Sequence, residues 1–214
     1  MACLGQMGRK FSKKDRYGTK KRATLFYENQ MLGYLNHQMK EFIAQQEMMF
    51  IATADRKGNC DNSFRSGRAG FVRVIDDKTV IYPEYRGNGV LASLGNISEN
   101  PHIGLLFIDF FKHGIGLHIN GKAKVIEHNR LEMVLPLTMV EGIQKSEEGK
   151  VEHWVVIKVE EAYVHCSKRI PMLQKIGMEE QKVKQATGDF FKVKKLKEDK
   201  KAADSEEKWK VYAT

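Results

Sequence analysis

From Met48 to Cys166 the chain is a succession of short apolar segments separated by turn residues, and this pattern constrains the fold more than any other feature. Segments rich in Val, Ile, Phe and Tyr with alternating polarity predict β-strands. We expect six or seven of them, among them 50–54, 60–64, 70–75, 102–110 and 116–127. Because strands and helices do not alternate regularly, the pattern favours a closed or split antiparallel barrel over a doubly wound parallel sheet.

Two further predictions concern where strands end. Pro83 should end the strand 78–82, since proline cannot donate to a sheet ladder. The last apolar segments predict two separate strands, 154–159 and 162–166.

Helices are predicted at three places. Residues 28–47 place apolar side chains at three- and four-residue spacing and predict one amphipathic helix, whose Met-rich stripe fits core or dimer packing. A short helix is expected over 88–97. Another is expected over 130–143, which Pro136 should kink or split.

Charge divides the chain into three parts. The formal net charge is +9, and residues 1–22 hold eight Lys or Arg against the single acid Asp15, so that this segment supplies +7. We predict a basic flexible leader (1–24), a barrel domain (25–172) and a charged, partly helical C-terminal extension (173–214). The leader could contact nucleic acid, but no aromatic stacking platform accompanies its charge, so a solvated arm is favoured.

The compartment is expected to be the cytoplasm. The apolar segments fall short of the roughly 20 residues that span a bilayer, and the basic N-terminal segment has no apolar signal region. Three scattered cysteines without CxxC spacing argue for a reducing compartment and against a disulfide framework or zinc site. Four histidines likewise lack a metal spacing: His102, His113, His118 and His153.

The segment 61–73 carries the first candidate site. Three arginines, two serines and two glycines stand between two predicted strands. Arginine offers a planar fork of donors to phosphate oxygens, serine adds neutral donors, and glycine lets backbone approach an anion. The segment therefore predicts a phosphate cradle, although a basic hairpin at a barrel rim would look the same. The candidate residues are Ser63, Arg65, Ser66, Gly70, Phe71, Val72 and Arg73.

The segment 82–97 carries the second candidate site. A strand ends near Pro83, a Gly-Asn-Gly turn follows, and the N-terminal N–H groups of the predicted helix could face an anion. An ordinary strand-to-helix turn with Asn88 as its N-cap would give the same pattern. The candidate residues are Pro83, Glu84, Tyr85, Asn88, Ser93 and Asn96.

Five pieces of sequence occur together and in order: Asp-x-Ser-x-Arg-x-Gly, Gly-Phe-Val-Arg-Val-Ile-Asp-Asp-x-Thr, Pro-x-Tyr-x-Gly-Asn, Leu-x-Asn-Ile-x-x-Asn-Pro-x-Ile-Gly-Leu-Leu-Phe and Ile-Asn-Gly-x-Ala. In this order, over residues 28–170, the chain resembles the pyridoxamine 5'-phosphate oxidase-like FMN-binding split-barrel family. The resemblance implies a mainly β (α+β) fold, a six-stranded antiparallel split β-barrel with peripheral helices. It also implies a homodimer with FMN at the subunit interface.

Particular residues follow from the resemblance. The phosphate contacts fall on Arg65, the segment from it to Gly70, and Ser93 with its neighbours. The isoalloxazine ring falls against Pro83, Glu84 and Tyr85. The resemblance also assigns two asparagines to the site, Asn88 and Asn96.

The chain departs from the oxidase at two points. Ala92 and Ser93 stand where the oxidase has an Arg/Lys pair for phosphate, and His165 to Arg169 stands in place of its substrate-binding signature. The resemblance therefore implies FMN binding without implying synthesis of pyridoxal phosphate. We predict a flavin-dependent oxidoreductase acting on an unidentified small molecule, with no catalytic residue assigned. The alternative is a non-catalytic protein that binds or senses flavin, haem or a deazaflavin.

Overall fold

The computed structural model describes residues 18–87, 89–146, 151–176, 190–198 and 200–201. The chain divides into two units, Met1–Leu173 and Gln174–Thr214. In the first unit, residues 20–24, which the sequence assigns to the leader, form part of a helix. In the second unit, residues 193–198 and 200–201 are helical.

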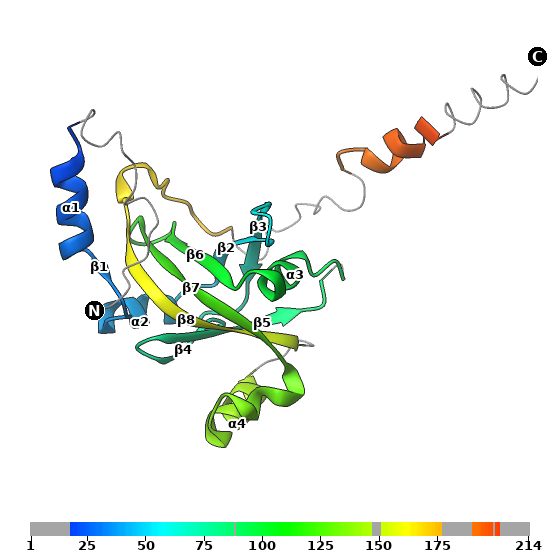
Figure 1. The fold of residues 1–214 in the computed structure, drawn as a ribbon, viewed down its shortest axis with the longest axis horizontal. Helices are drawn as coiled ribbons and strands as arrows, with labels where there is room; N and C mark the ends of the chain where they lie inside the picture. Colours follow the sequence, from blue (N-terminus) through cyan, green and yellow to red (C-terminus); the bar gives the residue numbers. More distant parts are fainter. Residues whose placement is uncertain (1–17, 88, 147–150, 177–189, 199, 202–214) are drawn as a thin grey trace, which may run out of the picture. The chain divides into compact units, whose positions relative to one another are not determined.

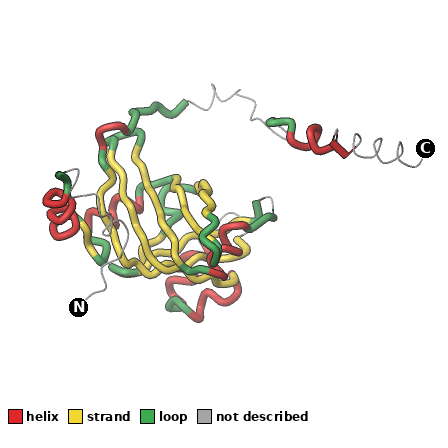
Figure 2. Tube along the Cα trace, turned by 45° about the horizontal axis from the view of Figure 1, so that its top comes forward, coloured by secondary structure: helices red, strands yellow, loops and turns green. Residues whose placement is uncertain are grey.

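The first unit is a mainly β structure with short helices (Figures 1 and 2). Its strands are β1 (Met31–Leu32), β2 (Met48–Ala54), β3 (Cys60–Ser66), β4 (Arg73–Asp76), β5 (Thr79–Tyr85), β6 (His102–Asp109), β7 (Ile115–Glu127) and β8 (Val151–His165). Its helices are α1 (Lys20–Asn29), α2 (His37–Ala44), α3 (Ala92–Glu99) and α4 (Leu137–Ser146), with 3₁₀ turns η2 (His128–Met133) and η3 (Ser167–Arg169).

All strands belong to one antiparallel sheet, in the order β3-β2-β6-β7-β8-β5-β4, with β1 added on β8. The predicted fold class, a mainly β split barrel with peripheral helices, is confirmed. The described sheet has eight strands rather than the six expected, because the short strands β1 and β4 join six longer ones. Within the described residues β3 and β4 do not pair with each other, so the sheet is not closed.

Two apolar clusters stabilise this sheet. The larger fills the concave side, where alternate side chains of β2, β6, β7 and β8 meet α2 and α3, and its fully buried members include Leu35, Ile43 and Phe107. The smaller lies between β8, η2 and α4 around Trp154, whose indole Nε1 donates to His128 Nδ1 at 3.1 Å. The first cluster includes residues of β5 and α3, two of the elements that carry the candidate site.

The prediction of one helix over 28–47 is wrong. Helix α1 ends at Asn29, β1 pairs with β8, and α2 begins only after Asn36. The Asn36 side chain accepts a hydrogen bond from Met39 N at 2.9 Å, the geometry of an N-cap that starts a new helix. Pairing of Met31 with Tyr163 supplies sheet bonds that the helical periodicity could not anticipate.

Three strand boundaries also differ from the predictions. The strand expected over 70–75 begins at Arg73, because Gly70 has φ +81° and residues before it form a turn. Pro83 does not end β5. The pairing between β4 and β5 stops at Ile81, so Pro83 costs no ladder bond on the β4 side of the strand. The two final strands are one strand, β8, with an irregularity opposite Asn120 and Gly121.

The short helix predicted over 88–97 is present as α3, but it begins at Ala92 and ends at Glu99. Three other predicted elements agree with the structure. The strand predicted at 102–110 is β6, and the one predicted at 116–127 is β7. The helical region at 130–143 is divided at Pro136 into η2 and α4, as expected for a residue that cannot continue a helix.

Candidate functional site

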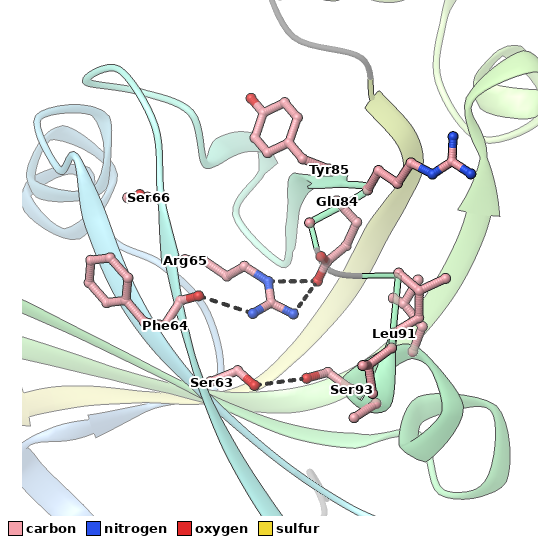
Figure 3. Close-up of a pocket in the computed structure, with 13 residues that line it drawn as sticks. Ser63, Phe64, Arg65, Ser66, Glu84, Tyr85, Leu91 and Ser93 are labelled. Carbon is pink, nitrogen blue, oxygen red and sulfur yellow. Dashed lines mark hydrogen bonds and ion pairs between the residues drawn. The ribbon is translucent and has the colours of Figure 1, made fainter. Parts of the chain in front are cut away.

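A cavity of about 440 Å³ opens where β3, the end of β5 and the start of α3 meet (Figure 3). The two strands are 19 residues apart at Arg65 and Glu84, and α3 follows β5 directly in the chain. The lining residues are Ser63, Phe64, Arg65, Ser66, Glu84, Tyr85, Arg86, Gly87, Val90, Leu91, Ala92, Ser93 and Leu94.

Arg65 and Glu84 form a shielded ion pair in this cavity. Arg65 Nε and Nη2 each lie 2.8 Å from Glu84 Oε1, and Nη1 donates to the Phe64 carbonyl at 3.0 Å. The exposed fraction of the side chain is 22% for Arg65 and 6% for Glu84. The ion pair orients the guanidinium between the strands, as Figure 3 shows.

A second polar cluster lies at the start of α3. The Ser63 and Ser93 hydroxyls both donate to Asp61 Oδ2 at 3.1 Å, and their oxygens are 3.2 Å apart. Ser93 is nearly fully buried. Asp61 and Ser63 share a face of β3 because they are two residues apart, and the contact with Ser93 ties this strand to α3.

The first turn of α3 also faces the cavity. Leu91 precedes the helix with φ +51° and makes no side-chain cap bond. Ala92, Ser93 and Leu94 all line the cavity, and the first N–H groups of an α-helix have no partner within it. Such a helix start favours an anionic group.

The cavity contains six of the thirteen predicted site residues. Five come from the strands β3 and β5, and Ser93 comes from α3; the six are Ser63, Arg65, Ser66, Glu84, Tyr85 and Ser93. Arg65 and Ser93 therefore line the same cavity.

The remaining predicted residues lie elsewhere. Phe71 and Val72 are buried in the larger core cluster, with exposed fractions of 4% and 1%. Asn96 donates to Thr53 Oγ1 at 3.0 Å and so connects α3 to β2. Gly70, Arg73 and Pro83 do not line the cavity, and Asn88 lies outside the described residues. The N-cap of α3 is Leu91 rather than Asn88.

Sequence reasoning did not select several cavity residues. Phe64 and Arg86 adjoin selected residues, and Val90, Leu91, Ala92 and Leu94 belong to the approach and first turns of α3. Asp61 is the first residue of the motif Asp-x-Ser-x-Arg-x-Gly and was not among the predicted site residues. Its two-residue spacing from Ser63 puts both side chains on one face of the strand. The spacing could have identified Asp61; the turn residues required the fold.

The donor set of the cavity fits a phosphate-bearing ligand. Arg65, the two serine hydroxyls and the start of α3 are all groups that bind phosphate oxygens. Among the residues described, no group of three or more His, Cys, Asp or Glu could hold a metal ion. The described helices include none long and apolar enough to cross a membrane.

The fold and the site define a mainly β split barrel with a cavity between β3, β5 and α3. A family model, that of pyridoxamine 5'-phosphate oxidase, matches residues 35–166. The chain therefore belongs to the pyridoxamine 5'-phosphate oxidase-like family.

Solved structures of similar fold include three bacterial proteins. HupZ of Group A Streptococcus is 24% identical, with 61% of this chain and 93% of that chain covered and a TM-score of 0.47. An FMN-binding protein from Syntrophomonas wolfei is 13% identical, with 71% and 97% covered and a TM-score of 0.40. General stress protein 26 from Bacillus anthracis is 12% identical, with 58% and 89% covered and a TM-score of 0.37. A comparison with curated proteins finds no match.

Proposed function

We propose that this chain binds FMN in the cavity between β3, β5 and α3 and acts as a flavin-dependent oxidoreductase on a small molecule. The observation that carries the proposal is the meeting of Arg65 with the open first turn of α3 in one cavity of about 440 Å³. A guanidinium and a helix N-terminus together favour a doubly charged phosphate.

The residues have distinct roles in this proposal. Arg65, Ser63, Ser93 and the α3 N–H groups hold the phosphate, and Glu84 and Tyr85 lie against the ring. Phe71 and Val72 belong to the core and do not contact the ligand in this proposal. Bound FMN would supply hydride or single-electron transfer. The chain itself binds and orients the cofactor and shields it from water.

A non-catalytic role is the second candidate. Within the described residues, the charged side chains of the cavity are already paired with one another or with neighbours: Arg65 with Glu84, and Arg86 with Glu152 at 3.6 Å. Paired charges suit binding better than proton transfer. On this hypothesis the barrel stores or senses flavin, haem or a deazaflavin.

The visible absorption spectrum of the purified protein is the direct test. A flavin band, or a rise in thermal stability on adding FMN, supports the proposed cofactor. A protein that stays colourless and shows no thermal shift with FMN contradicts it. Bound flavin that does not turn over with NAD(P)H, pyridoxamine phosphate or oxygen favours the non-catalytic role.

We also propose that the protein is a homodimer. Phe50 and Phe64 pair across β2 and β3 with ring centroids 5.5 Å apart, yet their exposed fractions are 39% and 52%. In register with them, Leu106 of β6 extends the same outer face. An exposed aromatic row next to a cavity that Phe64 itself lines suits an interface that completes the site.

For the compartment we propose the cytoplasm. Cys60 and Cys166 are exposed free thiols, which a reducing environment preserves. Cell fractionation with an antibody against the chain tests this, and recovery from an oxidising compartment with the thiols oxidised contradicts it.

A further inference from the structure

Arg65, the strongest hydrogen-bond donor that the cavity offers to a phosphate, is already paired with a carboxylate of the protein. The Arg65 guanidinium meets the Glu84 carboxylate at 2.8 Å through two nitrogens, and both side chains are largely shielded from water. Charges at such distances interact far more strongly where water is excluded than at an open surface. A phosphate that enters the cavity therefore meets an arginine whose charge is already balanced.

Glu84 is held rigidly where it stands. Glu84 pairs with His153 in the β5–β8 ladder, and the register shifts only between Glu84 and Tyr85. Two residues earlier on the same face, Tyr82 is fully buried. Burial first, and then the negative charge of Glu84, raise the pKa of the Tyr82 hydroxyl well above its ordinary value. The Glu84 carboxylate therefore lies beside both the Arg65 guanidinium and the buried Tyr82 hydroxyl.

The other side-chain donors show the same arrangement. Asp61 accepts the hydroxyl hydrogens of both Ser63 and Ser93. Arg65, Ser63 and Ser93 are thus each bound to a carboxylate of the protein. Of the two carboxylates, only Glu84 is paired with a full positive charge, so its removal changes the local charge balance most.

We propose that Glu84 is an internal counter-anion of Arg65 and determines how strongly the cavity prefers a phosphorylated ligand over the same ligand without phosphate. The proposal rests on the proposed binding of flavin in this cavity. Glu84 repels an incoming phosphate and competes with it for the same guanidinium hydrogens. Its negative charge therefore holds the phosphate preference below what Arg65 alone would give.

The test compares the dissociation constants of FMN and riboflavin in the wild type and in Glu84→Gln. Glutamine keeps the shape of the side chain and an oxygen that accepts from Arg65, but it removes the charge. We expect the preference for FMN over riboflavin to rise about tenfold, as an unscreened charge near a phosphate predicts. Glu160→Gln is the matched control. Glu160 Oε1 lies 3.6 Å from Nζ of the exposed Lys122, and neither residue lines the cavity. This control should leave the preference unchanged.

An unchanged or lowered preference in Glu84→Gln overturns the proposal. If that variant does not fold, Glu84→Met removes the same charge with a side chain of similar length. If the wild type binds neither flavin, the proposed function fails, and inorganic phosphate then tests Glu84 separately. At constant ionic strength, phosphate relative to chloride should raise the melting temperature of Glu84→Gln more than that of the wild type. An equal shift in both proteins overturns the role of Glu84.

Discussion

Individual residues of β3 show how a two-residue period becomes a binding surface. Asp61, Ser63 and Arg65 alternate along the strand and all reach polar partners from other elements: Ser93 of α3 and Glu84 of β5. Each contact bridges segments far apart in sequence. The polar face of one edge strand is therefore organised by elements that the local sequence of β3 does not contain.

Replacing Arg65 by alanine tests the phosphate contact. Loss of a charge-assisted hydrogen bond should weaken FMN binding by about 1.5–3 kcal/mol. Riboflavin, which lacks the phosphate, should bind the wild type weakly and lose little in the variant. Fluorescence titration of both ligands measures this, with thermal unfolding as a control because Glu84 loses its partner. Equal losses for the two ligands would show that Arg65 does not contact phosphate.

A second residue-scale feature is the histidine pair on β7 and β8. His118 Nε2 lies 2.8 Å from His165 Nδ1, and the His118 ring stacks on Tyr163 at 4.7 Å. Burial first, and then the charge of His165, lower the pKa of His118 below its ordinary value of 6.5. The folded state therefore binds fewer protons here than the unfolded state.

We expect this pair to make stability depend on pH. Because the folded pKa of His118 is lowered, its stabilising contribution is present above pH 6.5 and falls as the pH drops below that value. His118→Gln should reduce the loss of unfolding free energy between pH 7.5 and pH 5.5, measured by urea denaturation. The control His102→Gln changes an exposed histidine. The same pH dependence in wild type and His118→Gln would refute the assignment.

At the scale of elements, the β7–β8 pair is the centre of the sheet and contains its main irregularity. Asn120 pairs with Glu161 while Gly121 pairs with Val159, so Glu160 has no residue opposite it. The shift brings the Lys158 carbonyl oxygen against Gly121, inside the contact distance of any Cβ added there. A glycine in mid-strand is thus required by the close approach of a neighbouring backbone.

Two glycine substitutions should have opposite effects. Gly121→Ala should lower the free energy of unfolding by about 2–3 kcal/mol, because neither backbone can move without breaking ladder bonds. Gly142→Ala, in α4 with open space around its Cα, should raise it by about 0.5–1 kcal/mol. Urea denaturation of both variants measures the difference. A Gly121→Ala protein as stable as the wild type would mean that the register shift is not rigid.

On the scale of the whole molecule, one face of the sheet exposes aromatic side chains to solvent. The pair Phe50 and Phe64 stands exposed, and Phe64 also lines the cavity. Exposed aromatic pairs of this kind are typical of surfaces that bind another protein. In the homodimer proposed above, this face binds the second copy of the chain.

Phe50→Glu should convert the proposed dimer to a monomer, because a carboxylate would be buried in an apolar interface without a partner. Sedimentation velocity at several concentrations measures the association state. Met133→Glu is the control, since Met133 is 75% exposed on η2 and belongs to neither the row nor the cavity. A wild type that sediments as a monomer at every concentration would contradict the dimer.

The sequence by itself determined the elements whose pattern is local. A strongly apolar segment located β6, alternation of polarity located β7, and the ring of Pro136 separated η2 from α4. The order of short motifs indicated the family and placed Arg65 and Ser93 in one site. These features depend on residues close together in the chain, or on the motif order, and so could be predicted before any contact was known.

Only the tertiary structure decided the features that depend on pairing between distant segments. The bonds of Met31 with β8 interrupt the helical stripe, and packing against the core buries Phe71 and Val72 although their motif suggested a ligand contact. The Arg65–Glu84 pair joins two strands across the cavity. Ladder bonds, burial and charge pairing act between segments that are close in space but distant along the chain. The local sequence pattern therefore does not indicate which segments meet.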